Sequence, residues 1–431
     1  MYKKILFLLI FAFLNQCSLD TKTGLWSKTQ VVKEKKENIE EIFQSKEVLE
    51  KELNSHFKVR INSAYTKKPF INNLTNNTGY INFESNLDKI TKFKFKKIKN
   101  FDYINPDLLI GNDKSLVFFD EKGSILKFKK DSNLIWKKNH YLKKEIKEKP
   151  LIYFAANNKI LIAADTIANL YAMNYSNGDL IWKTLNAVPF HSEIKIFEDK
   201  VFLVDFENVI KCISIINGKE LWRFGTEKTL IKSQRKLSLI IQNGLVVFID
   251  TAGDINALDI NTGNLIWQSQ TINEDIFEST FLLKSSRLVS DNQTIFVSNN
   301  QNKLFAIDFR NGVIKWEQAI NSYLEPSIIE NILLTVSNEG YFFVIDKSNG
   351  NILRSTYILD RVKNKNIYPT GFIVAKKYIY VSLNNGRLIK VSIEDGKTKD
   401  QIKIDGDKIS RPYILDKQMY ILRNNAIIKI E

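Results

Sequence analysis

The feature that most constrains this chain of 431 residues is a pattern that repeats from about residue 106 to the C-terminus. Each copy has an apolar strand, a polar turn, a second strand of alternating character, a tight turn and a third strand. Because apolar residues alternate at a period of two, the copies predict antiparallel strands and not helices. In five copies the third strand carries a tryptophan, about once per 45 residues, at Trp136, Trp182, Trp222, Trp267 and Trp316.

The tight turn before the third strand uses the same kind of residue in copy after copy. An Asn, Thr or Asp is followed by a glycine, at Gly178, Gly218, Gly263, Gly312, Gly350 and Gly396. Tight hairpin turns need a positive φ, which glycine adopts freely. The glycines therefore predict a hairpin in each of these copies. In the later copies Arg354, and then Thr398 or Lys399, stand near the place of the tryptophan.

Prolines give an independent count of the copies. Proline cannot donate to a sheet ladder and suits the first position of a strand. One proline precedes the opening apolar stretch of six copies, at Pro106, Pro150, Pro189, Pro326, Pro369 and Pro412. The gap between Pro189 and Pro326 leaves room for two starts without proline, near residues 234 and 280. Four short strands per copy are typical of a propeller blade, so the fold predicted is all-β, an eight-bladed β-propeller of four-stranded antiparallel blades.

The last copy ends at Glu431 after three strands and lacks a fourth. The segment 89–99, KITKFKFKKIK, alternates apolar and basic residues ahead of the first blade. We expect this N-terminal strand to complete the last blade and close the ring, because closure removes the exposed edges of an open array. The predicted propeller therefore spans residues 89–431.

The N-terminus reads as a signal peptide covering residues 1–17. Lys3 and Lys4 precede ten apolar residues, Ile5 to Leu14. A helix of that length extends about 15 Å, too short for a hydrocarbon core of about 30 Å, so cleavage is the preferred interpretation. Leu14 and Cys17 resemble the bacterial lipoprotein signal and predict lipidation of Cys17, although Gln16 is larger than the residue usual there. A plain secretory peptide is the alternative.

Residues 18–88 are expected to form a tether or linker. Within them, residues 31–60 are dense in both charges and place Ile39, Phe43, Leu49 and Leu53 at roughly helical spacing, which predicts a charged helix. Residues 66–79 are rich in Asn and Thr and read as linker.

Composition argues against several other function classes. The 63 Lys and Arg against 48 Asp and Glu give a net charge of +15, but the basic residues are spread along the chain, so no nucleic-acid partner is expected. The two cysteines, Cys17 and Cys212, form no disulfide framework, and the three histidines stand far apart. We expect no metal site and no catalytic residues. The repeated tryptophans are interpreted as packing groups between blades.

The repeat resembles that of pyrroloquinoline-quinone-type propellers. The residues that carry the resemblance are Leu304–Asp308 with Asn311, Gly312 and Trp316, and it extends over about residues 90–431. Two families share this repeat. Quinoprotein dehydrogenases bind the quinone with calcium and commonly carry adjacent cysteines near it, which this chain lacks. The enzyme interpretation is therefore not favoured, and no cofactor is expected.

The second family is that of the outer-membrane protein assembly factor BamB, lipoproteins with an eight-bladed propeller of about this size. The stretch Thr23–Trp26 soon after Cys17 also resembles the beginning of its mature members. The resemblance implies a non-catalytic scaffold, lipid-anchored in the outer membrane and facing the periplasm. It would bind the periplasmic domains of a BamA-like partner, with unfolded barrel proteins as further clients. The alternatives are a quinoprotein dehydrogenase and a generic periplasmic protein-binding propeller lipoprotein.

Overall fold

The computed structural model describes residues 18–19, 26–27, 50–61, 78–81, 90–98, 101, 106–226, 233, 235–271, 283–362 and 366–431. Cys17 and residues 31–49 of the expected charged helix lie outside this set. Contacts divide the chain into a first unit, Met1–Val48, and a second, Leu49–Glu431. In the first unit β1 (Ser18–Leu19) pairs antiparallel with β2 (Trp26–Ser27).

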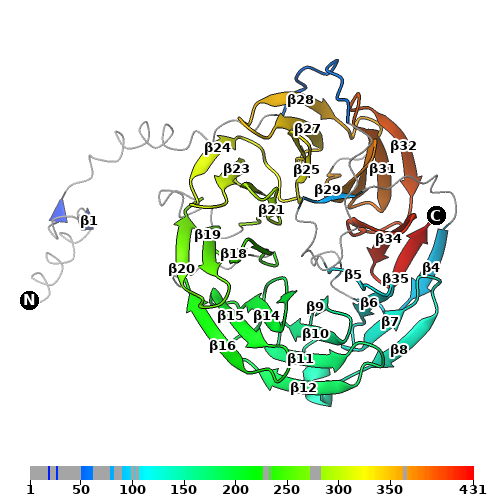
Figure 1. Cartoon of the computed structure of the whole chain (residues 1–431). Helices are drawn as coiled ribbons and strands as arrows, with labels where there is room; N and C mark the ends of the chain where they lie inside the picture. The colour runs from blue at the N-terminus through cyan, green and yellow to red at the C-terminus, as the bar shows by residue number, and fades with distance from the viewer. Residues whose placement is uncertain are drawn as a thin grey trace, which may run out of the picture. The chain divides into compact units, whose positions relative to one another are not determined.

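The second unit is a ring of eight sheets, which confirms the predicted eight-bladed propeller (Figure 1). In blades 1 to 7 the four blade strands follow chain order from the channel outward. Blade 1 consists of β5 (Leu109–Ile110), β6 (Leu116–Phe119), β7 (Ile125–Phe128) and β8 (Leu134–Lys138), and blade 2 of β9 (Ile152–Ala156), β10 (Ile160–Asp165), β11 (Asn169–Asn174) and β12 (Leu180–Leu185). Blade 3 consists of β13 (Lys195–Phe197), β14 (Lys200–Val204), β15 (Val209–Ser214) and β16 (Glu220–Gly225). Blade 4 consists of β17 (Leu239–Gln242), β18 (Leu245–Ile249), β19 (Ile255–Asp259) and β20 (Leu265–Ser269).

The two starts without proline, predicted near residues 234 and 280, correspond to β17 and to β21, the first strand of blade 5. Blade 5 consists of β21 (Val289–Ser290), β22 (Thr294–Asn299), β23 (Lys303–Asp308) and β24 (Ile314–Gln318), and blade 6 of β25 (Ser327–Ile329), β26 (Ile332–Val336), β27 (Tyr341–Asp346) and β28 (Ile352–Tyr357). Blade 7 consists of β29 (Pro369–Ala375), β30 (Tyr378–Leu383), β31 (Arg387–Ser392) and β32 (Thr398–Lys403). Blade 8 consists of β33 (Pro412–Leu415), β34 (Gln418–Arg423), β35 (Ala426–Ile430) and β4 (Ile90–Lys94).

The ring closes as the sequence predicts. Strand β4 pairs antiparallel with β35, from Ile90 opposite Ile430 to Lys94 opposite Ala426. The eighth blade therefore takes its outer strand from the N-terminal side of the propeller, and the C-terminus lies beside β4 in Figure 1. Phe93 of β4 is buried, so the closing strand also contributes to the core.

Parts of the expected linker lie on the propeller. Strand β3 (Tyr80–Ile81) adds to the inner strand of blade 7 in parallel, opposite Val374 and Ala375. Residues 50–61 run without helix along the outer strand of blade 6, where Leu53 and Ser355 exchange two backbone hydrogen bonds of 3.1 and 2.9 Å. The charged helix expected over 31–60 is therefore wrong for residues 50–60, because they form these contacts instead.

One row of paired residues crosses each blade and passes through the tryptophan. In blade 4 it runs from Ile240 through Val247 and Ala257 to Trp267. In all five tryptophan-bearing blades the outer member of this row is the tryptophan, so we call it the tryptophan rung. In blades 6, 7 and 8 the outer members are Arg354, Asp400 and Thr91. For blade 7 the structure places Asp400 there and not Thr398 or Lys399, because the rung residue stands four positions after the turn glycine, as Trp267 does after Gly263.

Each tryptophan contacts the next blade. Trp267 lies against Gly312, whose φ is +75°, so that a Cβ added there would fall 2.5 Å from the ring. Trp267 Nε1 also donates to the Phe309 carbonyl of that blade at 3.2 Å. The same arrangement joins Trp136 to Gly178, Trp182 to Gly218, Trp222 to Gly263 and Trp316 to Gly350, each with an Nε1 bond to a backbone carbonyl.

The buried apolar side chains of the described residues form seven clusters, and each draws on neighbouring blades. The second strands are almost entirely buried because a neighbouring blade covers each of their faces. A short helix, α3 (Lys143–Lys147), follows blade 1. Among the described residues, no helix has the length and apolar character needed to cross a membrane.

Candidate functional site

The tryptophan rung places one residue of every blade at the same point of the central channel. This residue stands two positions before the inner-strand member of the rung, where the chain enters the blade from its neighbour. We call these eight residues the mouth ring. They are Asp107, Tyr153, Glu193, Ser238, Arg287, Glu325, Gly371 and Arg411.

Six members of the mouth ring line a cavity of about 160 Å³ at the end of the channel. Glu193 lines a smaller adjoining cavity, which shares Asp107 and Arg287 with the first. Gly371 leaves room for its neighbour, because a Cβ at this position would lie 2.4 Å from the Cβ of Arg411. Five of the other members bring charge, so the mouth is polar although the blades around it are apolar.

Arg287 of blade 5 joins carboxylates from three other blades. Its Nε lies 3.1 Å from Glu193 Oε1 of blade 3, and its Nη1 lies 3.6 Å from Glu325 Oε2 of blade 6. Its Nη2 pairs with Asp107 of blade 1. Although burial opposes it, Glu193 and Glu325 raise the pKa of Arg287. A single guanidinium therefore links inner strands that lie on different sides of the channel.

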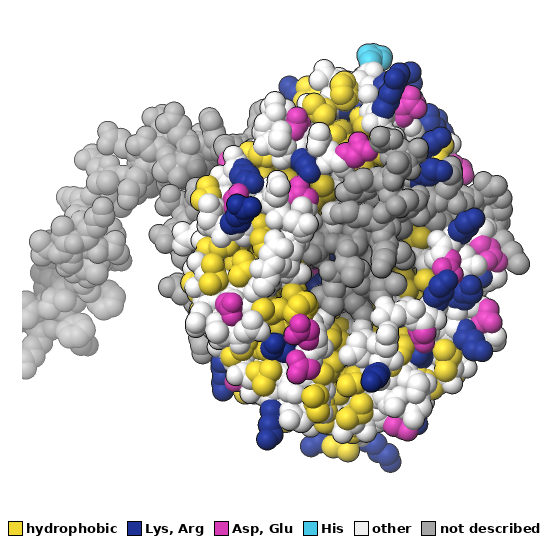
Figure 2. Space-filling model, viewed as in Figure 1, with side chains coloured by type: hydrophobic (Ala, Val, Ile, Leu, Met, Phe, Trp, Pro, Cys, Tyr) yellow, Lys and Arg dark blue, Asp and Glu magenta, His cyan; other side chains and the backbone are white. Residues whose placement is uncertain are grey.

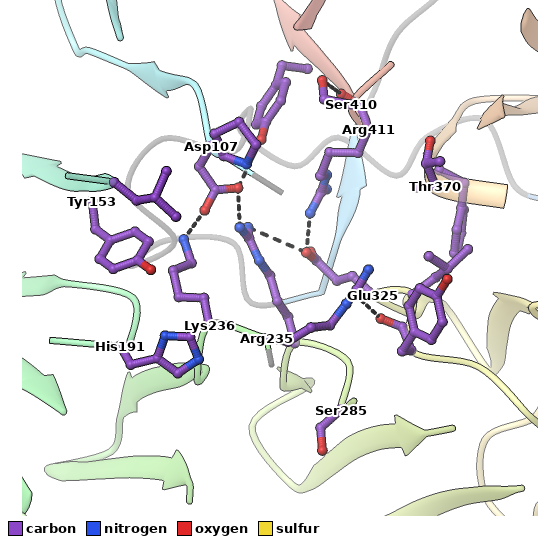
Figure 3. Close-up of a pocket in the computed structure, with 18 of the residues that line it drawn as sticks. Asp107, Tyr153, His191, Arg235, Lys236, Ser285, Glu325, Thr370, Ser410 and Arg411 are labelled. Carbon is purple, nitrogen blue, oxygen red and sulfur yellow. Dashed lines mark hydrogen bonds and ion pairs between the residues drawn. The ribbon is translucent and has the colours of Figure 1, made fainter. Parts of the chain in front are cut away.

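Further cations share these carboxylates. Lys236 pairs with Asp107 and Arg411 pairs with Glu325, and Figure 3 shows their charged ends converging. Lys195 Nζ lies 3.3 Å from Glu193 Oε2. Burial, reinforced by Arg287 and Arg411, lowers the pKa of Lys236.

Arg235 differs from the other cations of the mouth. Its Nη1 donates to the Tyr323 carbonyl at 2.6 Å, and its guanidinium lies 4.0 Å above the Tyr323 ring. No carboxylate among the described residues pairs with it, although it lines the cavity. Burial lowers the pKa of Arg235 to about 10. With Lys195, Lys236, Arg287 and Arg411 it makes five cations against three carboxylates.

His191 also lines the cavity but adds no charge at neutral pH. Its ring stacks on Phe206 with centroids 4.2 Å apart, and its Nε2 lies 2.9 Å from the Ser233 carbonyl. Burial lowers the pKa of His191 to about 4. The excess charge of the mouth therefore comes from lysine and arginine.

The residues singled out from the sequence lie elsewhere. The tryptophans are on outer strands, and the six turn glycines have positive φ in turns on the face opposite the mouth. Cys212 is a buried, free thiol in β15, and burial raises its pKa to about 12. Within the described ranges, no three His, Cys, Asp or Glu side chains are placed to hold a metal ion. On the face drawn in Figure 2, basic and acidic side chains of the described residues are interspersed around the ring.

Sequence reasoning missed the mouth ring, although part of a signal was present. Asp107, Glu325 and Arg411 each adjoin one of the prolines that open a copy. Charged residues next to strand-opening prolines mark where the chain reaches the channel. Their identities differ from blade to blade, so the repeat pattern itself does not display them.

Comparisons with known proteins agree with this architecture. A family model described as outer membrane protein assembly factor BamB matches residues 121–356. A protein of that name from Moranella endobia is 24% identical over 269 residues, which cover 59% of this chain and 67% of the relative. Another from Shewanella oneidensis is 22% identical over 308 residues, covering 70% and 76% of the two chains.

Solved structures show the same fold at low identity. The crystal structure of BamB from Moraxella catarrhalis superposes with a TM-score of 0.61 at 14% identity, over 80% of this chain and 97% of that one. Quinohemoprotein alcohol dehydrogenase from Comamonas testosteroni gives 0.62 at 9% identity, over 82% and 78%. Both similarities establish the propeller and carry no statement about activity.

Proposed function

Because the chain belongs to the BamB family of outer-membrane protein assembly factors, we propose that it is a non-catalytic scaffold of the machinery that assembles outer-membrane β-barrel proteins. The observation that carries this proposal is the family match over residues 121–356. In this role the propeller binds the periplasmic domains of a BamA-like partner, and unfolded barrel proteins are further clients.

The mouth face offers an apolar contact point for such a partner. Leu185, the last residue of β12, is 72% exposed, more than any other large apolar side chain among the described residues. It lies where blade 2 passes to blade 3, on the face that carries the mouth ring. An exposed leucine on the same face as a charged cavity combines an apolar anchor with polar surroundings, as protein-binding surfaces do.

The loop after Leu185 is held in place by its own hydrogen bonds. Asn186 Nδ2 donates to the Val188 carbonyl at 2.7 Å, and Lys211 Nζ donates to Asn186 Oδ1 at 2.6 Å. A partner that docks on a fixed loop loses little affinity to ordering it. A closed propeller with rigid loops therefore suits a scaffold.

The test measures binding of the intact lipid-free chain to the purified periplasmic domains of a BamA-like protein. We expect Leu185→Asp to weaken binding about 10-fold or more, because a buried apolar contact is replaced by a charge. Leu221→Asp is the matched control, since Leu221 is 51% exposed near the start of β16, on the opposite face. Absence of binding by the unchanged chain would contradict the proposal.

Lipid anchoring is the second part of the proposal. It rests on Leu14 and Cys17, which fit the lipoprotein signal in sequence. Cys17→Ser should move the full-length chain from the membrane fraction to the soluble periplasmic fraction. Retention of the variant in the membrane would show that Cys17 is not the anchor.

A dehydrogenase assay separates the scaffold from the quinoprotein alternative. Pyrroloquinoline quinone and Ca²⁺ are added to the purified chain, and dye-linked alcohol oxidation is followed. The scaffold proposal expects no turnover above that of the quinone alone. Saturable, calcium-dependent oxidation would overturn it.

A further inference from the structure

We propose that the cavity at the channel mouth binds a carboxylate group, with Arg235 as the anchoring cation. The site is built from five cations and three carboxylates of different blades, and its formation depends on no partner. Only the source of the carboxylate rests on the proposed function. It is either an acidic side chain of the docked partner or a free carboxylic acid.

The first argument is the unbalanced charge. Arg287, Lys236, Lys195 and Arg411 each meet a carboxylate, whereas Arg235 meets only the ring and carbonyl of Tyr323 among the described residues. A cation in a concave, partly desolvated site is costly unless an anion accompanies it. Arg235 nevertheless lies in a concave site on the propeller axis, where a ligand can supply the missing negative charge.

The second argument is the geometry of Arg235. Because Tyr323 accepts from Nη1 and covers one face of the guanidinium, the plane of the group is fixed. No hydrogen bond from the described residues engages its Nε or Nη2. A planar, oriented guanidinium with donors free on one edge matches the two oxygens of a carboxylate.

The third argument selects a carboxylate over a phosphate. Asp107 and Glu325 line the same cavity as Arg235 and would repel a ligand of charge near −2 more strongly than one of charge −1. The excess of two cations suits a monoanion. Phosphate therefore serves as a discriminating probe.

The fourth argument is the shape and lining of the cavity. Its volume of about 160 Å³ equals roughly five water molecules at about 30 Å³ each, enough for the end of an acidic side chain. Leu151, Tyr153 and Phe372 line it beside the charged groups. These walls contact the methylene groups of a ligand while Arg235 holds its charged end.

The experiment titrates the lipid-free chain with acetyl-Gly-Glu-Gly-amide at fixed ionic strength. The glutamine analogue and inorganic phosphate are the comparison probes. We expect the glutamate peptide to bind at least about 10-fold more tightly than either, as loss of a charge-assisted hydrogen bond costs about that factor. Equal binding of the glutamate and glutamine peptides, or tighter binding of phosphate, would overturn the proposal.

Variants assign the binding to Arg235. Arg235→Gln should abolish the preference for glutamate, and Arg235→Lys, which keeps the charge and loses the planar fork, should retain part of it. Arg310→Gln, on an exposed turn, is the matched control and should bind as the unchanged chain does. Thermal unfolding of each variant establishes that it is folded. A folded Arg235→Gln that keeps the full preference would overturn the assignment.

The same variants identify the source of the carboxylate. Weaker binding of the BamA-like periplasmic domains by Arg235→Gln would assign it to the partner. Unchanged partner binding, together with lost peptide binding, would assign it to a free acid. If the unchanged chain binds the glutamate peptide but no partner domain, the proposed function fails and the carboxylate site stands.

Discussion

The interfaces of blades 1 to 5 with their following blades differ from the interface between blades 6 and 7. At the first five, a tryptophan covers the turn glycine of the next blade and donates one hydrogen bond to a backbone carbonyl there. At the sixth, Arg354 occupies the same rung and is fully buried. Its Nη2 donates to the Ile393 carbonyl at 2.7 Å, a bond of the same kind.

The difference lies in what each side chain needs from the rest of the chain. A tryptophan has one donor and a large apolar surface, so the next blade satisfies it completely. Arg354 has further donors, and its Nη1 reaches the carbonyls of Glu394 at 2.6 Å and Phe57 at 2.9 Å. Phe57 belongs to the segment 50–61, so this interface is completed by chain that lies outside the repeats.

The largest expected effect is at a tryptophan interface. Trp267 is 7% exposed, and Trp267→Ala should lower the free energy of unfolding by about 4 kcal/mol, because a large cavity opens between blades 4 and 5. Urea unfolding followed by circular dichroism measures the change. Leu265→Ala on the same strand, where the side chain is 43% exposed, is the control and should change stability little. A loss below about 1 kcal/mol for Trp267→Ala would contradict the packing role.

Arg354→Ala should cost about 3 kcal/mol, since three backbone carbonyls lose a charged donor. Unlike Trp267→Ala, it should also loosen a distant segment. Hydrogen exchange of the Leu53 amide, which bonds to the Ser355 carbonyl, should accelerate in Arg354→Ala and stay unchanged in Trp267→Ala. Equal exchange in both variants would remove the distinction between the two kinds of interface.

The turn glycines test how tightly each interface is packed. Gly312→Ala should cost about 2 kcal/mol, because the residue has φ +75° and its Cβ would meet the ring of Trp267. Gly396→Ala should cost about 1 kcal/mol, because its φ is also positive but its Cβ would meet the hydroxyl and methyl of Thr356, a smaller group than the Trp267 ring. Thermal unfolding of the two variants compares them. A larger loss at Gly396 would show that the arginine interface is the tighter one.

Acid should weaken the arginine interface through a carboxylate next to its turn glycine. Asp395 precedes its turn glycine. At the five tryptophan interfaces this place holds an Asn, except before Gly263, where it holds a Thr. Although burial opposes it, the hydrogen bonds from Lys399 and the Lys397 amide lower the pKa of Asp395 to about 2. A lowered pKa stabilises the fold above pH 3.8, and this contribution is lost as pH falls through 2.

The pH measurement compares Asp395→Asn with the unchanged chain. The side chain is 28% exposed, so the loss near neutral pH should be about 1 kcal/mol after screening by solvent. The difference should shrink as pH falls through 2 and vanish below it, where both side chains are neutral. A difference that stays constant with pH would exclude the Asp395 charge as its cause.

Some parts of the molecule could be predicted from the sequence, and others could not. The blade count followed from prolines and turn glycines, and closure by β4 followed from the missing last strand. Asp400 was missed although it stands four residues after Gly396, the spacing that also separates Gly263 from Trp267, because an aspartate does not mark the place as a tryptophan does. Residues 50–60 were assigned to a helix because their contacts with Ser355 and Arg354 come from chain about 300 residues away.

The candidate site was harder to predict for a different reason. A repeat pattern is recognised from residues that its copies have in common. The mouth ring consists of residues that differ in type from one blade to the next. Arg287, Glu193 and Glu325 occupy one register position with opposite charges, and they pair only after the ring brings their blades together. The register position of these residues was predictable, but the ion pairs between them form only when the ring is closed.

The pairing of β4 with β35 makes closure of the ring depend on strands that lie far apart in the chain. Ile90 is made long before its partner Ile430, so the first outer strand waits until the eighth blade has been made before it can pair. A chain cut short before residue 426 leaves an unpaired edge on both sides of the gap, which proteases and chaperones recognise. Ring closure is thereby delayed until the eighth blade has been made, and copies that lack this blade remain visible to quality control.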